Sequence, residues 1–383
     1  MNSSETPFEV LIAGGGVAAL EAALALRDLA DARVSTTLLA PDPDFFYRPM
    51  RVREPFGYSA ARSYPLAEIA ADIGAHLVTD SFKWLDAEGS VVHTEQGRKL
   101  GYEALLLAMG ARLRPAFAHV LTVDDRRLDE QLHGLVQDIE GGYVHSLAFL
   151  IPTPMPWPLP AYELALMTAR RAYEMQTEVS LTVVTPEDAP LALFGDDVSD
   201  TVTRLLEKHS IEMITSAHAG VPSAGAVAIH PGGRTLSFDR IVALPQLSGP
   251  STPGVPGGAP GGFIPVDINC KVRDLERVFA AGDATDFPVK HGGVAAQQAD
   301  AAAEAIAALA GAPVKPQPFH PEIRAILLGA DKPLYLSAHI TGGHGSSSKV
   351  SEEPMWSPPA KIAAKYLAPY LESRDRGAEQ AVR

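Results

Sequence analysis

Residues 8–26 read FEVLIAGGGVAALEAALAL, and this stretch decides the fold that the sequence predicts. The apolar run at residues 10–13 predicts a buried parallel strand, and the Ala- and Leu-rich run after residue 16 predicts a helix. Between them, GGGVAA at residues 14–19 matches GxGxxG/A after a strand and before a helix. This order of strand, glycine turn and helix predicts a Rossmann-like unit that binds a dinucleotide.

Each position of this turn has a physical reason in a pyrophosphate site. Gly14 permits the tight turn, and Gly16 has no side chain that would hold a pyrophosphate away from the backbone. Val17 and Ala18 begin the helix, whose N-terminus offers N–H groups and the positive end of its dipole to phosphates. Ala19 is small enough for the helix to pack closely on the strand. We therefore predict that these five residues form a dinucleotide site.

Composition limits the classes of protein to consider. The chain has 383 residues, of which 46% are hydrophobic and 20% charged, as expected for a globular protein of about two domains. A formal net charge of −14 argues against a general nucleic-acid binder. No apolar run is long enough to span a bilayer, and the N-terminus lacks the basic flank and apolar segment of a secretory signal. We expect a cytoplasmic protein with no nucleic-acid partner and no metal site.

A second parallel strand is predicted at residues 34–39. An acidic residue near the end of this strand ordinarily binds the adenosine ribose. Ala40 stands where that acid is usual and Asp42 follows slightly late, so Asp42 is either the ribose ligand or the start of a turn. Arg48 lies in FFYRPMRVREPF (residues 45–56), which is either a wall of the cofactor site or a surface loop.

The rest of the chain predicts two sheets. Residues 76–100 alternate like an antiparallel meander, and ALLLAMGA at residues 104–111 predicts a buried strand that returns to the first sheet. A second α/β unit begins near residue 116. Its expected elements are strands at residues 147–151, 179–184 and 211–214 and helices at residues 162–175 and 196–208.

The first sheet is completed far downstream. VFAAGDA at residues 278–284 predicts a buried strand that ends in Gly-Asp, and PVKHGG at residues 288–293 precedes an Ala-rich helix that runs to about residue 309. Three strand-like runs follow. A last helix is predicted from residue 359 to about residue 373.

Together, the GxGxxG/A turn, the AMGA turn and VFAAGDA before an Ala-rich helix resemble the FAD-dependent pyridine nucleotide-disulfide oxidoreductase superfamily. Within it, the chain is most similar to the branch of sulfide:quinone oxidoreductases and flavocytochrome c sulfide dehydrogenases. The resemblance implies an α/β fold with two Rossmann-like, glutathione-reductase-like domains and a small C-terminal α+β segment. It implies an FAD-binding domain (residues 1–115 and 240–315), a second domain with a degenerate NAD site (residues 116–239) and the C-terminal segment (residues 316–383).

The resemblance also implies FAD as the cofactor and a place for each motif. The helix N-terminus after residue 291 would face the pyrimidine edge of the flavin and raise its reduction potential. Lys290 and His291 would lie beside the cofactor, although both are also typical of a solvated loop. The remaining residues implied in cofactor binding are Ala108, Met109, Gly110, Gly282, Asp283, Gly292, Gly293 and Val294.

Two departures from the resembling branch affect function. The turn after the second domain's first strand is PTPMPWPLP (residues 152–160), which has no glycine and too few N–H groups to wrap a pyrophosphate. Trp157 and Pro158 stand where this branch has Cys-Pro, and Cys270 is the one cysteine of the chain. We interpret Cys270 as a structural residue, so the sequence lacks the redox cysteines of this branch.

Glu163 and Lys290 are the residues expected to take part in chemistry. Relatives place a glutamate like Glu163 at the start of the second domain's first helix, where it faces the flavin and moves a proton. The alternative is that Glu163 only suits the positive end of the helix. We also expect Met355 and Trp356 to reach the exposed face of the flavin.

The sequence therefore predicts an FAD-dependent two-electron oxidoreductase with a small-molecule donor and a quinone as acceptor. Two alternatives stay open: an NAD(P)H-dependent reductase with unusual nicotinamide binding, and a flavoprotein without turnover that serves as a redox sensor or binding partner. The apolar face of the last helix fits packing on the protein or in a homodimer, and weak peripheral membrane contact is the other reading.

Overall fold

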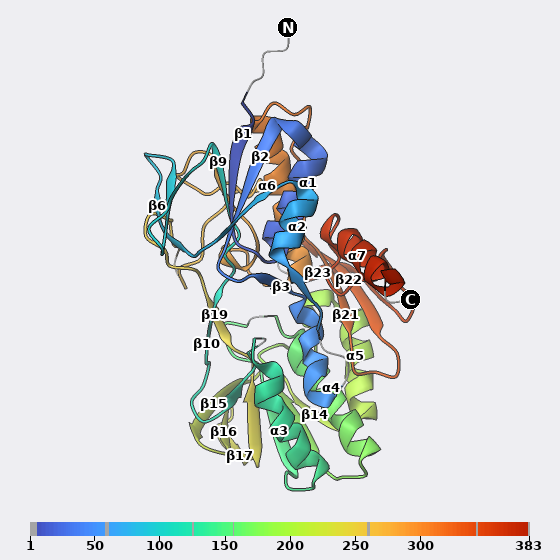
Figure 1. Cartoon of the computed structure of the whole chain (residues 1–383). Coiled ribbons are helices and arrows are strands. Elements are labelled where there is room, and N and C mark those ends of the chain that lie inside the picture. Colours follow the sequence, from blue (N-terminus) through green and yellow to red (C-terminus); the bar gives the residue numbers. More distant parts are fainter. Residues whose placement is uncertain are drawn as a thin grey trace.

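The computed structural model describes residues 6–57, 61–124, 126–155, 157–258, 261–341 and 344–381. Two parallel sheets form two bodies, one above the other in Figure 1. The upper sheet has the order β20-β9-β1-β2-β5, and all its neighbours pair in parallel. Its strands are β1 (Phe8–Ala13), β2 (Val34–Ala40), β5 (His76–Thr79), β9 (Ala104–Leu107) and β20 (Val278–Ala280).

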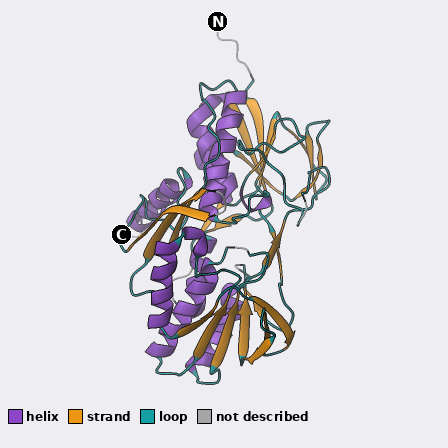
Figure 2. Cartoon of the chain, turned by 180° about the vertical axis from the view of Figure 1, so that it is seen from behind, coloured by secondary structure: helices purple, strands orange, loops and turns teal. Residues whose placement is uncertain are grey.

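The helices of the upper body gather on one face of its sheet, as the view from behind shows (Figure 2). They are α1 (Val17–Ala30), α2 (Leu66–Ile73) and α6 (Gly292–Leu309). Alanines of α1 and α6 lie in one apolar cluster, and these small side chains allow the two helices to pack closely. The other face packs against the antiparallel strands β6 (Phe82–Asp86), β7 (Val91–Thr94) and β8 (Lys99–Gly101) and against Val255 and residues 264–275.

The lower sheet has the order β11-β18-β12-β13-β14 and is also parallel. Its strands are β11 (Leu121–Thr122), β12 (Ser146–Leu150), β13 (Ser180–Val184), β14 (Ile211–Ile214) and β18 (Arg240–Ala243). The helices of this body are α3 (Leu128–Glu140), α4 (Leu159–Glu174) and α5 (Asp196–Lys208). An antiparallel sheet of β15 (His218–Ser223), β16 (Ala226–His230) and β17 (Arg234–Ser237) packs on the face away from the main helical core.

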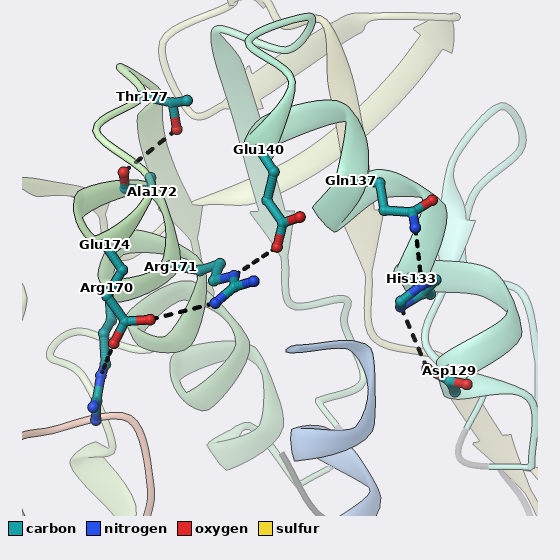
Figure 3. A network of polar contacts seen from close by, with 9 residues as sticks. All are labelled: Asp129, His133, Gln137, Glu140, Arg170, Arg171, Ala172, Glu174 and Thr177. Atoms are coloured by element: carbon teal, nitrogen blue, oxygen red, sulfur yellow. Dashed lines mark hydrogen bonds and ion pairs between the residues drawn. The ribbon is translucent and has the colours of Figure 1, made fainter. Parts of the chain in front are cut away.

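A polar network joins two helices of the lower body (Figure 3). Arg171 of α4 donates from Nε to Glu140 Oε1 of α3 at 2.5 Å. Arg171 also lies 3.6 Å from Glu174, which Arg170 contacts at 2.8 Å. These contacts fix the C-terminal ends of α3 and α4 together, so the N-terminal end of α4 has a defined position at the site described below.

Short elements connect the two bodies. An antiparallel pair of β10 (Arg112–Arg114) and β19 (Gln246–Ser248) lies between them. β3 (Asp44–Phe46) pairs with β4 (Ser63–Pro65), and a 3-10 helix spans Arg48–Phe56. The chain thus has the predicted fold class, α/β with two Rossmann-like parallel sheets.

Residues 76–79 correct the predicted meander. They form β5, which pairs in parallel with β2 and so belongs to the upper sheet. The helix α2, which the sequence reasoning did not predict, returns the chain to the edge of that sheet as a parallel strand requires. The meander itself is present and begins at Phe82.

The C-terminal part forms a sheet of β21 (Glu322–Leu327), β22 (Leu334–Thr341) and β23 (His344–Ser351), followed by α7 (Leu367–Ala381). The last helix was predicted from residue 359, and this was wrong. Pro369 lies in the first turn of α7, where a missing N–H is tolerated, whereas a helix from residue 359 would hold it in the interior. Residues 359–366 are therefore not helical, and we call them the C-terminal strap.

The apolar side of this region packs on the protein. Ile362, Leu367 and Leu371 are at most 5% exposed and belong to the same cluster as α1 and α6. Within the described ranges, none of the helices has both the length and the apolar character needed to cross a membrane.

The close packing of α1 on α6 gives a test of the fold. Ala302 of α6 is 0% exposed, so Ala302→Leu adds carbon atoms where the helices leave no room. We expect a loss of about 1–3 kcal/mol in the free energy of unfolding, measured by urea denaturation. Ala378→Leu on the exposed surface of α7 is the matched control, expected within about 0.5 kcal/mol of wild type. Equal losses in both variants would contradict the packing described here.

Candidate functional site

A cavity of about 550 Å³ lies where the two bodies and the C-terminal part meet. The strands β1, β2, β9 and β20 end together at one edge of the upper sheet. Ala13 pairs with Leu39 and Leu107, and Leu107 also pairs with Ala280. The residues that follow these strands line the cavity. Its far side is formed by the start of α4, by β21 and by the strap.

Most of the predicted site residues line this cavity. They are Gly14, Gly16, Val17, Ala18, Asp42, Arg48, Ala108, Met109, Gly110, Glu163, Gly282, Asp283, Lys290, His291 and Gly292. Ala19, Gly293 and Val294 do not line it. Ala19 is 0% exposed, as its predicted role in packing the helix on the strand requires, and Val294 is 2% exposed in the core of the lower body.

The glycine turn has room for a ligand at one position and none at another. Gly14 has a φ of 142°, and a Cβ there would lie 2.2 Å from Ala108 O, so only glycine fits. A Cβ on Gly16 would meet nothing within 4 Å, which leaves open space beside the start of α1. Gly16 is the N-cap of α1 and contributes no capping side chain, and the first turn has no acidic residue. The positive end of this helix therefore faces the cavity, and the turn fits a pyrophosphate.

His291 is the N-cap of α6 and is nearly enclosed. Its Nδ1 accepts a hydrogen bond from Gly293 N at 3.2 Å, which assigns the proton of the neutral ring to Nε2. Burial, with the nearby charge of Lys361 adding to it, lowers the pKa of His291 to about 4. The ring lies 4.6 Å from that of Trp157. His291 is thus a neutral N–H donor and not a solvated loop residue.

Lys290 lines the cavity, but its ammonium group is held by the protein. Nζ donates to Thr285 O at 2.5 Å and lies 3.9 Å from the centre of the Phe263 ring. Burial lowers the pKa of Lys290 to about 8, although the charges of Asp283 and Asp286 act in the opposite direction. Lys290 is therefore half-buried and fixed in position, which also excludes a freely solvated side chain.

A buried ion pair closes the far end of the cavity. Lys361 Nζ of the strap lies 2.7 Å from both carboxylate oxygens of Glu163 on α4. The two side chains are 7% and 1% exposed. Lys361 also donates to Pro49 O at 3.0 Å, and Glu163 Oε1 accepts from Leu328 N at 2.9 Å. The pair thereby joins α4, the strap, the 3-10 helix and the end of β21.

Burial acts on the two charges of this pair in opposite directions. It raises the pKa of Glu163 and lowers the pKa of Lys361, while the attraction between the two groups opposes both shifts. The two pKa values are thereby brought toward each other, so a proton transfer between Lys361 Nζ and Glu163 is less costly than in water. The pair is suited to hold a proton and pass it on.

Lys361 is the site residue that the sequence analysis missed, because it was assigned to the face of a helix. Pro369 is the signal that would have excluded that helix. Met355 and Trp356 were expected at the flavin, but they do not line the cavity. They line a separate cleft together with Arg204 and Lys349.

Trp157, Leu159 and Pro160 of the proline turn line the same cavity. Glu187 follows the end of β13, where an acid would bind the ribose of a second dinucleotide. Its Oε2 instead accepts hydrogen bonds from Tyr162 at 2.5 Å and Thr185 at 2.9 Å inside the protein. Burial raises the pKa of Glu187 to about 7.

No family model matches the chain. The sulfide:quinone oxidoreductase of the bacterium Aquifex aeolicus is similar in structure, with a TM-score of 0.78, 20% identity and coverage of 90% of this chain and 87% of that one. This chain has its fold. A ferredoxin reductase from Rhodopseudomonas palustris gives a TM-score of 0.67 at 20% identity, covering 87% and 83%. An NAD-dependent persulfide reductase from A. fulgidus gives 0.62 at 19% identity, covering 88% of this chain and 65% of that one.

These similarities confirm the predicted two-sheet fold. The three structures are named as an oxidoreductase and two reductases, while this chain has one cysteine and a proline turn in the lower body.

The buried pair predicts a large asymmetry between single and double changes. Lys361→Met leaves Glu163 buried without its cation, and we expect a loss of about 3–5 kcal/mol in the free energy of unfolding at pH 7. Adding Glu163→Leu removes the unpaired acid and should restore much of this loss in urea denaturation. Lys332→Met is the control, because it breaks an ion pair whose side chains are 67% and 60% exposed, expected to contribute at most about 1 kcal/mol. Additive losses in the double variant would contradict the pairing.

Proposed function

We propose that this protein is an FAD-dependent oxidoreductase that transfers two electrons between small molecules without a cysteine relay. The observation that carries the proposal is the continuity of one cavity, which joins a pyrophosphate-type glycine turn to a buried acid–base pair. The similarity in fold to named oxidoreductases supports it.

The residues fit the cofactor at successive places along the cavity. Residues 14–18 and the N-terminus of α1 would bind the pyrophosphate, and Asp42 at the end of β2 would bind the ribose. Residues 108–110 and Asp283 would line the middle of the cofactor. Neutral His291 and the N-terminus of α6 would favour negative charge beside them. Bound FAD supplies a carrier that accepts and returns two electrons.

The Glu163–Lys361 pair supplies the proton that accompanies this electron transfer. Its proton resides between Glu163 and Lys361 Nζ, and no other ion pair with both side chains this enclosed is present among the described residues. Because the site is buried, the proton is held at a fixed position and not exchanged at random with water. General acid–base groups positioned in this way typically contribute about 10²–10⁴-fold to a rate.

The thiol of Cys270 takes no part in this scheme. Cys270 is 0% exposed, and burial raises the pKa of its thiol to about 12, so it is neither accessible nor a thiolate. Apolar side chains of Val52, Trp157, Ala325 and Ile326 line the same cavity as the pair. An apolar wall beside a proton source suits a quinone, and we propose a quinone as the acceptor.

The glycine turn gives a test of cofactor binding. Gly16→Val fills the open space beside α1, and we expect FAD affinity to fall about tenfold or more, which is about 1.4 kcal/mol or more. The ratio of flavin to protein absorbance and the Kd from reconstitution measure this. Gly101→Val in β8 is the control, because a Cβ there also meets nothing within 4 Å and lies outside the cavity. Equal retention of FAD in both variants would contradict the assignment.

Anaerobic stopped-flow spectroscopy at the flavin band tests the electron transfer. Because a turn with five prolines has too few N–H groups to bind a second pyrophosphate, we expect NADH and NADPH to leave the flavin oxidised. After chemical reduction, a short-chain quinone should reoxidise the flavin, and Glu163→Gln should slow this step by about 10²-fold or more. Rapid bleaching by either nicotinamide, or an unchanged rate in Glu163→Gln, would overturn this part of the proposal. Sulfide is tested in the same way as a donor.

A further inference from the structure

The C-terminal strap has a second buried attachment, at its other end. Tyr366 N donates to Glu21 Oε1 at 2.9 Å, and Leu367 N donates to Glu21 Oε2 at 2.6 Å. Glu21 belongs to α1 and is 0% exposed. A carboxylate of one helix therefore caps the N-terminus of another helix, α7, in the protein interior.

Asp300 of α6 is the neighbour of Glu21 in this interior. Its Oδ1 is fully buried, and among the described residues no donor reaches it. The Glu21 and Asp300 side chains are within hydrogen-bonding contact of each other. Two carboxyl groups can form such a bond only when one of them holds a proton.

We propose that one proton shared between Glu21 and Asp300 holds the start of α7 and the strap in place, and that loss of this proton releases them together with Lys361. The carboxyl pair, the start of α7 and Lys361 are linked through one short segment. Glu21 of the pair contacts residues 366 and 367, and Lys361 lies five residues before Tyr366. The inference does not depend on the flavin chemistry proposed above, because every group in it belongs to the chain.

The electrostatics of the interior agree with a shared proton. Burial raises the pKa of Asp300 to about 8, with Glu21 and Glu304 adding to the shift and Lys365 opposing it. Burial also raises the pKa of Glu21, opposed by the amides of residues 365–367. The charged and titratable groups that face the pair are therefore Lys365 and Tyr366 of the strap and Glu304 of α6, and Asp28 of α1 acts on Tyr366.

The direction of the pH effect follows from these shifts. In the released state both acids regain ordinary pKa values of about 4, so the attached state holds one more proton between about pH 4 and pH 8. The stabilisation is complete below about pH 4 and is lost as the pH rises to about 8. Release thus becomes about tenfold more favourable per pH unit within this window and changes little above it.

Hydrogen exchange of the full-length protein, followed by mass spectrometry of the α7 peptide, measures this. A protection factor is the intrinsic exchange rate divided by the observed rate, so the pH dependence of intrinsic exchange is removed. The protection factors should fall about tenfold per pH unit from pH 6 to pH 8 and then level off. Asp300→Asn keeps a donor to Glu21 but cannot ionise, and it should make the protection factors nearly independent of pH. Asp28→Asn is the control with the same change of charge on an exposed part of α1, and it should keep the wild-type slope.

Two results would overturn the proposal: a flat wild-type profile, or the same slope in wild type and Asp300→Asn. If Asp300→Asn does not fold, Glu21→Gln serves instead. It removes the part of the Asp300 pKa shift that comes from Glu21, so the fall in protection should level off at a lower pH than in wild type, and its overall protection should be lower because one amide oxygen replaces two carboxylate acceptors. FAD retention, measured beside exchange, tests the proposed cofactor separately.

Discussion

The buried contact between Glu163 and Lys361 is the constraint on which the site depends. Removing two charges from water is costly, and such a pair is tolerated only where its geometry and further hydrogen bonds are good. Here Nζ is 2.7 Å from both carboxylate oxygens, and Pro49 O and Leu328 N complete the network. Because these groups come from four separate segments, the cavity is complete only when the strap is in place.

The Ala-rich packing of α1 on α6 has the matching role at the other end of the cavity. Both helices begin at the same edge of the upper sheet, where its parallel strands end, which is the usual ligand-binding place of open α/β sheets. Small side chains allow the two helix N-termini to line one cavity together. Glu21 of α1 is buried beside this interface and bonds to the start of α7, so a helix that lines the cavity also holds the strap.

The parts of the site that the sequence predicted are those with a local pattern. The glycine turn, the strand before Gly282 and the helix after His291 each follow from neighbouring residues, and the glycine turn, Gly282 and the start of that helix line one cavity. The Glu163–Lys361 contact joins residues 198 apart, and no local pattern encodes it. The strap was missed because its apolar spacing resembles a helix, and the position of Pro369 decides against that reading.

A relay through sulfur needs an accessible thiolate, whereas a proton donor needs a positioned acid–base pair. This chain has the pair but not the thiolate. Its one thiol is buried and protonated, so covalent relays through sulfur are not available to it. The acid–base pair, by contrast, is enclosed and multiply bonded, and it is supplied partly by a strap whose far end is fixed through two acidic side chains. A site built in this way would make proton supply, and not a reactive cysteine, the feature that the fold controls. Because Lys361 and the cap of α7 lie on one short segment, any change that frees one end of the strap also weakens the other.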